Sequence, residues 1–572
     1  MNIKLKEHFL NPFTLFLIIW GILNLVQARF TPLNNDEAYY WMYSKYLAWG
    51  YFDHPPMIAL MIRIGYYLFH NELGVRLIVV ITQLITLLII WQAIDKEQRG
   101  KKGNILLFFM IVVILPVYNM FGFIATPDSP LIFFTAVFLL VYKQFLEEET
   151  WQNTLFLGIT IAALMYSKYH SALLIILIIL SNPGLLKKIK FYIAACISFL
   201  LFFPHLLWQY SNGFPSVKYH LVERVSSFNF AHVPEYLASQ FFYHNPFILV
   251  LLVWIMVKVR AKNLFDKALY YLIAGFLIFF FISSFRYRVE PQWTALISVP
   301  MIIILLNNAD FKPSVRGYVK WTAIVFFPLF LVARSACMID YLPVSFFKNE
   351  FHKKKQWVRD ISNLAGDRPV VFTNSYQRAA VYTFYTGKLA YTLDNISYRK
   401  TQYDIWNFEE QVHGKEVFYV PHYYPDFYKQ YLTKHILTSG DSIFTRIFKN
   451  FHSLQRECII LADDQYTFSR TGINTIHLKI FNPYPYIIDF RDKELPVVFE
   501  IGFFKKGILE FKKNLDLPAE ISELKVGETI SVDCQFTLKD LPPGSYKMAI
   551  CSETGILYIA SNSRFREARI ND

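Results

Sequence analysis

The 572-residue sequence lacks the short motifs that identify many soluble enzymes and nucleic-acid-binding proteins. It contains no P-loop, no Rossmann glycine fingerprint, no H-E-x-x-H zinc motif and no G-x-S-x-G nucleophile elbow. Its five cysteines show neither C-x-x-C nor Cys/His metal spacing. No Lys/Arg-rich block accompanies the net charge of +13. The sequence therefore argues against nucleotide, zinc and nucleic-acid binding.

Charge is also scarce. Charged residues make up 18% of the chain and hydrophobic residues 54%, with a mean hydropathy of +0.30. A typical soluble domain has about 25% charged and roughly 45–50% apolar residues. The basic residues are spread between long apolar runs, as in the loops of membrane proteins. The composition predicts a polytopic α-helical membrane protein.

We expect about eleven membrane spans, allowing about 20 residues for each and fewer inside a bundle. They are predicted near residues 9–27, 73–94, 104–122, 129–146, 153–167, 170–181, 191–209, 246–260, 267–285, 293–308 and 318–338. Lysine and arginine concentrate in alternate loops, which places those loops and the N-terminus in the cytoplasm. The N-terminal run also resembles a signal peptide, with Val26-Gln27-Ala28 as a cleavage context, but we favour an uncleaved anchor because many spans follow.

Beyond about residue 340 the hydropathy falls, and span parity places the rest of the chain in the periplasm. The expected division is a transmembrane domain over 1–339, an α/β domain over 340–460 and a small β-sandwich over 461–572. The α/β prediction rests on a strand–helix–strand pattern in RPVVFTNSYQRAAVYTFYTGKLAYTL. Alternating strands with turn signals predict the sandwich.

The most unusual stretch is residues 34–56, NNDEAYYWMYSKYLAWGYFDHPP, which follows the first span and is predicted to face outward. Asp36 and Glu37 lie beside an apolar phase, where acids are costly and tend to be functional. A solvated helix end is the alternative for this pair. The following aromatics, including Tyr39 and Tyr40, are typical of a membrane interface.

Other outward segments carry further candidates. Asp128 in ATPDSP is a second isolated acid, for which a helix N-cap is the alternative. Lys168 interrupts an apolar run, which indicates a bound acid or anion unless the side chain snorkels to the headgroups. The remaining candidates are the cations Arg224, Arg286 and Arg288, for phosphate or lipid anchoring, and Asp53 and His54, for shaping the site.

Five segments together carry a family resemblance: the stretch beginning NNDEAYYW, ATPDSPLIFF, SKYHSALL, FPHLLWQYSNGFPSVKYHLVERV and EPQWTAL. In this order and spacing they resemble the bacterial family related to protein O-mannosyltransferases, which includes lipid A aminoarabinose transferases and rhizobial core-sugar transferases. The resemblance covers residues 1 to about 410. The terminal sandwich lies outside it.

The resemblance implies a C-type membrane glycosyltransferase that uses a polyprenyl-phosphate sugar donor at the periplasmic face of the inner membrane. Asp36 would be the base, Glu37 would position it, and Asp128 would support the site. Lys168, with Arg286 or Arg288, would neutralise the leaving phosphate. Tyr39, Tyr40, Asp53 and His54 would bound the pocket. The acceptor would be a glycolipid, polysaccharide or protein, with membrane lipids as further partners.

No cofactor is implied. Close members of the family mostly work without a catalytic metal, although two acid sites could hold a divalent ion. Two other functions remain open on the residues alone. A transporter or flippase of a lipid-linked sugar would predict acids at mid-membrane and internal pseudo-symmetry, whereas an envelope binding or scaffold protein would leave the costly charges unexplained.

Overall fold

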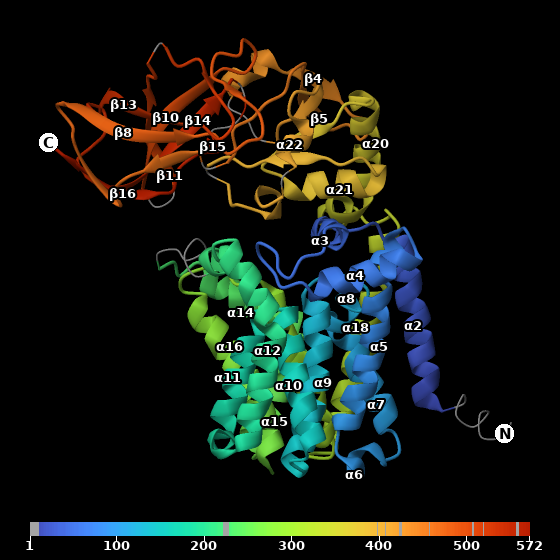
Figure 1. Ribbon diagram of the computed structural model, residues 1–572. Helices are drawn as coiled ribbons and strands as arrows, with labels where there is room; N and C mark the ends of the chain where they lie inside the picture. Colours follow the sequence, from blue (N-terminus) through green and yellow to red (C-terminus); the bar gives the residue numbers. More distant parts are fainter. Residues whose placement is uncertain are drawn as a thin grey trace. The chain divides into compact units, whose positions relative to one another are not determined.

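The computed structural model describes residues 11–220, 228–396, 398–406, 408–422, 426–456, 458–505, 508–518, 520–555, 557 and 560–572. The chain forms two compact units, one ending at Lys354 and the other running from Lys355 to Asp572. Helices dominate the first unit and sheets the second (Figure 1).

Polar caps and prolines set the helix ends of the first unit. Asn11, Asn71, Thr150 and Asn263 each accept a hydrogen bond from a backbone N–H in the first turn of the helix that follows. The helices, with the 3-10 and π segments marked η, are α2 (Pro12–Phe30), α3 (Asn35–Lys45), α4 (Met57–Leu68), α5 (Glu72–Ala93), α6 (Lys96–Arg99), α7 (Asn104–Ile114), α8 (Pro116–Met120), α9 (Asp128–Glu147), α10 (Trp151–Ser167), α11 (Ser171–Ser181), η1 (Pro183–Lys187), α12 (Ile189–Ser211), α13 (Pro215–Lys218), α14 (His232–Tyr243), α15 (Pro246–Lys258), α16 (Leu264–Ser283), η3 (Pro291–Ile297), α17 (Ser298–Asn307), α18 (Ser314–Met338), α19 (Ser345–Phe347) and η4 (Lys348–His352).

Each of the eleven segments predicted to span the membrane contains a helix, but many of these helices are short. Among the described residues, six helices are long and apolar enough to cross a membrane: α2, α5, α9, α12, α16 and α18. The pair α14 and α15, bent by 93° at a short break, would be a seventh. Helices such as α7 and α11, with 11 residues each, fall below a full membrane crossing. Length and composition therefore support six or seven spans.

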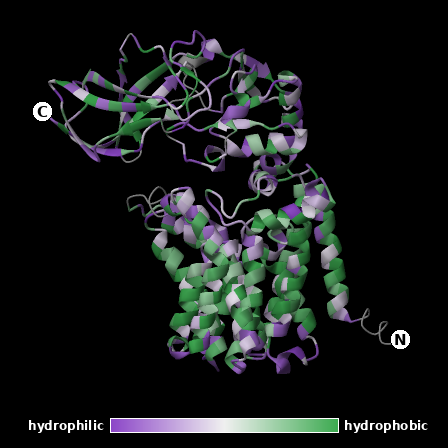
Figure 2. Cartoon of the chain, in the orientation of Figure 1, coloured by the Kyte–Doolittle hydropathy of each residue, from purple (hydrophilic) through white to green (hydrophobic). Residues whose placement is uncertain are grey.

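The long helices carry apolar residues on their outer surfaces as well as in the core. On α2, Leu15, Ile19 and Ile22 are all more than half exposed, whereas Trp20 is buried. Apolar residues follow the helices and polar residues gather at the two ends of the bundle (Figure 2). Helices α3 and α4 lie at one end of this unit, and α6, in the Lys/Arg-bearing loop, lies at the other (Figure 1). A multi-pass membrane protein has this distribution of polarity.

The segment after His54-Pro55-Pro56 forms the 12-residue helix α4. It packs against α5 through a contact that depends on two glycines. A Cβ atom on Gly65 would lie 2.3 Å from the carbonyl oxygen of Gly74, and one on Gly74 would lie 1.7 Å from the carbonyl oxygen of Phe69. Only glycine at both positions allows this close approach.

Residues 340–354 lie with the helical unit, beyond the expected boundary near residue 339. Two polar contacts hold them there. His352 Nε2 lies 2.7 Å from the carbonyl oxygen of Ala336, and Lys354 Nζ donates to the carbonyl oxygen of Leu33 at 3.3 Å.

The second unit begins with a five-stranded sheet of order β2-β1-β3-β5-β4. Strand β1 pairs in parallel with β2 and β3, while β5 is antiparallel to β3 and β4. The elements of this part are α20 (Lys354–Ala365), β1 (Val370–Thr373), α21 (Tyr376–Thr386), β2 (Tyr391–Leu393), η5 (Gln402–Asp404), α22 (Glu409–Val412), β3 (Val417–Val420), η6 (Asp426–Tyr431), β4 (Thr433–Ile436) and β5 (Ser442–Phe448).

Two further sheets share one apolar core, as in a β-sandwich. One has the order β11-β10-β14-β16-β7, with β15 beside β14, and the other has the order β13-β8-β6, while β12 and β9 form a separate pair. Buried and exposed residues alternate along β8 and β13, as sheets with one solvated face require. The strands are β6 (Ile459–Leu461), β7 (Gln465–Ser469), β8 (Ile473–Phe481), β9 (Ile488–Asp489), β10 (Val497–Lys505), β11 (Ile508–Leu515), β12 (Glu523–Leu524), β13 (Thr529–Thr537), β14 (Gly544–Thr554), β15 (Ala560–Ser561) and β16 (Arg566–Asn571).

A buried carboxylate joins the two parts of the second unit. Glu409, on α22, accepts hydrogen bonds from Ser453 Oγ at 2.7 Å and from Tyr484 Oη at 3.0 Å. Tyr484 lies between β8 and β9 of the sandwich, and its hydroxyl also accepts from the backbone N–H groups of Gln455 and Arg456. Burial raises the pKa of Glu409 to about 7.

Candidate active site

Helix α3 begins with a capping box that fixes the Asp36–Glu37 pair. Asn34 is the N-cap: its side chain accepts from the backbone N–H of Glu37 at 2.8 Å, and Glu37 Oε2 accepts from the backbone N–H of Asn34 at 3.1 Å. Asp36 and Glu37 occupy the first turn, where the helix dipole favours negative charge. Glu37 is fully buried, while Asp36 is exposed. The two adjacent acids therefore differ in surroundings.

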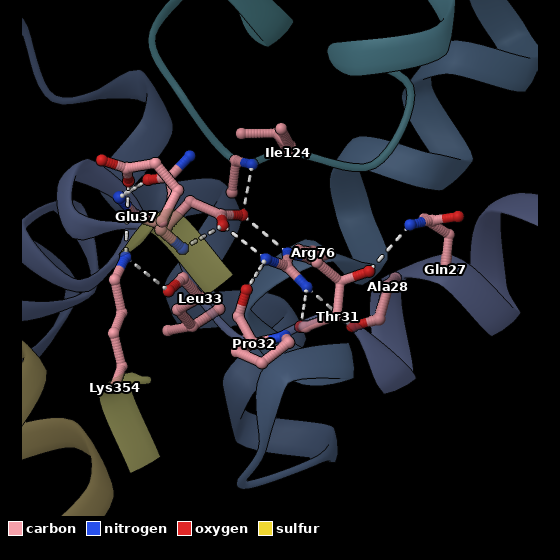
Figure 3. A network of polar contacts seen from close by, with 12 residues as sticks. Gln27, Ala28, Thr31, Pro32, Leu33, Glu37, Arg76, Ile124 and Lys354 are labelled. Atoms are coloured by element: carbon pink, nitrogen blue, oxygen red, sulfur yellow. Dashed lines mark hydrogen bonds and ion pairs between the residues drawn. The ribbon is translucent and has the colours of Figure 1, made fainter. Parts of the chain in front are cut away.

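The Glu37 carboxylate forms a buried, two-pronged ion pair with Arg76 on α5 (Figure 3). Arg76 Nε donates to Oε1 at 2.7 Å and Nη2 donates to Oε2 at 2.5 Å. The remaining N–H groups of Arg76 donate to the carbonyl oxygens of Ala28, Thr31 and Pro32. All five guanidinium donors are thus used, as a buried arginine requires.

Glu37 also fixes the loop that leads to the next candidate acid. The backbone N–H of Ala125 donates to Glu37 Oε1 at 2.8 Å, so each oxygen of this carboxylate accepts two hydrogen bonds. Asp128 follows three residues after Ala125. Glu37 thus holds α3, α5 and this loop together.

Asp128 and Lys168 form a second buried ion pair. Lys168 Nζ lies 2.7 Å from Asp128 Oδ1, and both side chains are about 95% buried. Asp128 is the first residue of α9, where Pro127 takes the N-cap position. Lys168 ends α10 as its C-cap residue. The capping alternative for Asp128 is therefore not the arrangement observed, and the costly lysine is matched by an acid.

The aromatic residues after Asp36 are mostly packed inside the fold. Tyr39 and Tyr40 are buried, and their rings lie 4.7 Å and 5.7 Å from that of Tyr43. Tyr43 donates to Asp53 Oδ1 at 2.5 Å, and burial together with this carboxylate raises the pKa of Tyr43. His54 packs edge-on against Tyr40, with ring centres 5.6 Å apart. These residues are packed inside the fold, while Tyr46, Leu47 and Trp49 are the large apolar side chains that the stretch exposes.

The loop over residues 46–56 is fastened to the end of α12 and to the segment that follows it. His205 Nδ1 lies 2.7 Å from the carbonyl oxygen of Trp49, and Ser216 Oγ donates to the carbonyl oxygen of Tyr51 at 3.0 Å. Gly50 contacts Trp208 so closely that a Cβ atom would lie 2.4 Å from the indole ring. The first outward loop is therefore held by a segment about 150 residues away in the sequence.

The late cations differ in position. Arg288 is largely exposed, and its Nε lies 2.7 Å from a carboxylate oxygen of Glu235 on α14. Arg286 is also exposed, and Arg224 lies outside the described residues. Trp293, just after these arginines, packs 4.9 Å from the ring of His170, two residues beyond Lys168. The late loop therefore lies next to the Lys168 turn.

Sequence reasoning missed two cations. Arg76 lies in the apolar run of the second predicted span, and the cost argument applied to Lys168 applies to it equally. Lys354 lies near the drop in hydropathy, where a lysine carries no comparable signal. Nothing local indicated that it would contact residues more than 300 positions away.

Two of the candidate acids are paired with cations: Glu37 with Arg76 and Asp128 with Lys168. Among the described residues, no three His, Cys, Asp or Glu side chains come close enough to hold a metal ion. The carboxylates, cations and hydroxyl groups of the site are suited to proton transfer by an exposed acid and to neutralisation of a phosphate by buried or loop cations.

Comparison with known proteins matches this picture in sequence and in fold. A family model described as dolichyl-phosphate-mannose-protein mannosyltransferase matches residues 53–208. Lipid A galacturonosyltransferase RgtD of Rhizobium johnstonii is 23% identical over 274 residues, which cover 44% of this chain and 56% of that protein. The chain thus spans about half the length of the curated relative that it matches.

Two crystal structures of ArnT from Cupriavidus metallidurans share the fold at 14% sequence identity. The apo structure gives a TM-score of 0.55 and covers 75% of this chain and 97% of ArnT. The structure bound to undecaprenyl phosphate gives a TM-score of 0.54 and covers 76% and 97%. These findings confirm the resemblance seen in the sequence. The chain is a multi-pass membrane protein with the fold of ArnT, and its sequence is similar to that of a lipid A galacturonosyltransferase.

Proposed function

We propose that this protein transfers a sugar from a polyprenyl-phosphate donor to a lipid, glycan or protein acceptor at the periplasmic face of the inner membrane. The observation that carries the proposal is the exposed Asp36 carboxylate at the start of α3, held in place by the buried Glu37–Arg76 pair. The N-terminus and the loop containing α6 would lie in the cytoplasm, opposite this site, as the Lys/Arg-bearing loops indicate.

In this reaction Asp36 takes the proton of the acceptor hydroxyl as its oxygen attacks the anomeric carbon of the donor sugar. The new glycosidic bond forms while the bond from the sugar to the phosphate oxygen breaks. The electron pair leaves with the polyprenyl phosphate. An exposed acid suits this role because solvent and substrate can reach it, whereas Glu37 is fully buried and each of its oxygens accepts two hydrogen bonds.

The leaving phosphate needs a cation. Lys168 offers one, since an ammonium has three donors and the observed bond to Asp128 uses one of them. Asp128 then aims and balances this charge in the absence of substrate. The exposed Arg286 and Arg288 would act as a second, outer contact for phosphate, because arginine binds phosphate with two parallel hydrogen bonds.

The donor class is supported by the fold shared with ArnT, which has been crystallised with undecaprenyl phosphate. The acceptor class is supported by the relative that acts on lipid A. The rival function, a flippase of a lipid-linked sugar, predicts acids near the middle of the membrane. Asp36, Glu37 and Asp128 instead lie at helix starts and are linked by the Ala125 loop, which favours the transferase.

The test is transfer of radiolabelled sugar from polyprenyl-phosphate donors to envelope glycolipids by the purified protein in liposomes. A transferase releases free polyprenyl phosphate as labelled product forms, whereas a flippase or scaffold does not. Asp36→Asn should lower the rate by at least about 100-fold. Asp340→Asn, which changes an exposed acid just after α18, is the matched control and should be fully active. Full activity of Asp36→Asn would exclude Asp36 as the base.

A further inference from the structure

The helical unit ends on a buried lysine next to the proposed base. Lys354 is its last residue, and only 7% of its surface is exposed. Its ammonium donates to the carbonyl oxygen of Leu33, three residues before Asp36, at 3.3 Å (Figure 3). It also lies 3.5 Å from Glu350 Oε2. A buried lysine is rare unless its charge is matched, so the burial of Lys354 needs an explanation.

The charges around Lys354 come from two directions. Glu350 lies on η4 one turn earlier, while Glu37 and Asp36 act on it from α3. Burial lowers the pKa of Lys354, and these three carboxylates oppose that shift. Arg76 lies on the side of Glu37 away from Lys354 (Figure 3). Lys353 and Lys355 flank Lys354 in the chain.

Arg76 and Lys354, both buried beside α3, make different contacts with it. Arg76 commits both prongs of its guanidinium to Glu37 and its other donors to backbone oxygens. The ammonium of Lys354 holds the segment just before Asn34, the N-cap of α3, through a backbone oxygen. It also places a positive charge within reach of Asp36.

We infer that Lys354 is a positioning residue of the proposed transferase: it holds the start of α3, and with it Asp36, in place, and its positive charge acts on the Asp36 carboxylate. The inference rests on the proposed function. Lys354 touches neither sugar nor phosphate in this role and acts through Asp36. The competing explanation is that Lys354 serves only to form the ion pair with Glu350, which we call the latch. This explanation predicts a different response to substitution.

Three variants separate the two explanations, measured as transfer rate against pH in liposomes. Lys354→Met removes the charge and keeps the length. It should lower kcat by about 10- to 100-fold, with little change in KM for the donor. It should also move the acidic limb of the pH profile to higher pH, because losing a nearby positive charge favours the protonated form of a carboxylate.

Lys354→Arg keeps the charge and should restore most of the rate and the wild-type acidic limb. Glu350→Gln keeps the ammonium of Lys354 and removes the latch, so its acidic limb should not move to higher pH. Lys348→Met, six residues earlier in the same segment, is the control and should behave as wild type. Thermal unfolding of each variant in detergent identifies any loss that comes from misfolding.

Two results would overturn the inference. In the first, Lys354→Met is active with an unchanged pH profile. In the second, Glu350→Gln reproduces both the rate loss and the pH shift of Lys354→Met, which would leave only a latch. Both can be distinguished from failure of the proposed function, since in that case the wild-type protein itself would transfer no sugar and the inference would fall with it.

Discussion

Arg76 and Glu37 face each other across α5 and α3 with both side chains fully buried, joined by two parallel hydrogen bonds of 2.7 and 2.5 Å. Because no solvent reaches either side chain, each charge is balanced by the other. The pair is therefore an all-or-none element, in which loss of either member strands the other in the protein interior.

Replacing one member alone should lower the free energy of unfolding by far more than the intact pair contributes to it. We expect Arg76→Met or Glu37→Gln to destabilise the protein by about 3–5 kcal/mol, because a single buried charge remains. The double variant should lose less than the sum of the two. Thermal unfolding in detergent measures the coupling. If the single effects simply add, the two side chains do not depend on each other.

For the Asp128–Lys168 pair we predict that substitutions affect stability and transfer rate differently. Lys168→Met should lower both, since it leaves Asp128 buried without its partner. Asp128→Asn combined with Lys168→Met should recover much of the stability but not the transfer rate, which we expect to stay about 100-fold or more below wild type. Recovery of the rate in the double variant would mean that Lys168 is structural only.

The close approach of α4 and α5 predicts a steric effect. Gly65→Ala should destabilise the protein by about 1–3 kcal/mol, because the new methyl group would meet the carbonyl oxygen of Gly74 at 2.3 Å. Gly317→Ala is the matched control in α18, since nothing lies within 4 Å of its added Cβ. It should be neutral or slightly stabilising, because alanine favours the helix. Melting temperatures of the two variants decide the point.

Glu409 predicts a pH-dependent junction in the second unit. Its pKa of about 7 lies above the unfolded value near 4.5, so the folded state holds the proton more tightly. The resulting stability is complete below about pH 4.5 and is lost as the pH rises through 7, with a total of about 3 kcal/mol. Thermal unfolding between pH 5 and 8 should show this fall.

Glu409→Gln should remove that pH dependence, because glutamine cannot ionise. Its neighbour Glu410, which pairs with Arg456 at 2.5 Å and is partly exposed, supplies the control. Glu410→Gln should leave the pH dependence in place. A wild-type protein whose second unit is equally stable at pH 5 and pH 8 would contradict the role given to Glu409.

Much of the architecture was predictable because it follows from polarity along the chain. Apolar runs located the helices, and the scarcity of acids made Asp36, Glu37 and Asp128 stand out. The pairing of those acids was not predictable in the same way. Arg76 and Lys354 reach Glu37 and Leu33 only after helices far apart in sequence pack together.

Two expectations met geometry that sequence does not encode. Counting apolar segments cannot separate a full membrane crossing from a short buried helix such as α7, so the expected number of spans was higher than length supports. Tyr39 and Tyr40 carried an interfacial pattern but are buried, and the ring of Tyr40 packs against His54 of the loop that follows.

The bend between α14 and α15 separates a short apolar helix from the segment before it. Helix α15 has 13 residues and therefore rises about 20 Å, whereas the hydrocarbon layer of a bilayer is about 30 Å thick. If α15 alone meets the hydrocarbon layer, we expect the bilayer beside it to thin locally or to let flanking polar groups reach inward. Headgroups there would lie deeper than beside the 22-residue α5. A lipid-linked reactant would then present its phosphate at a different depth beside α15 than beside α5.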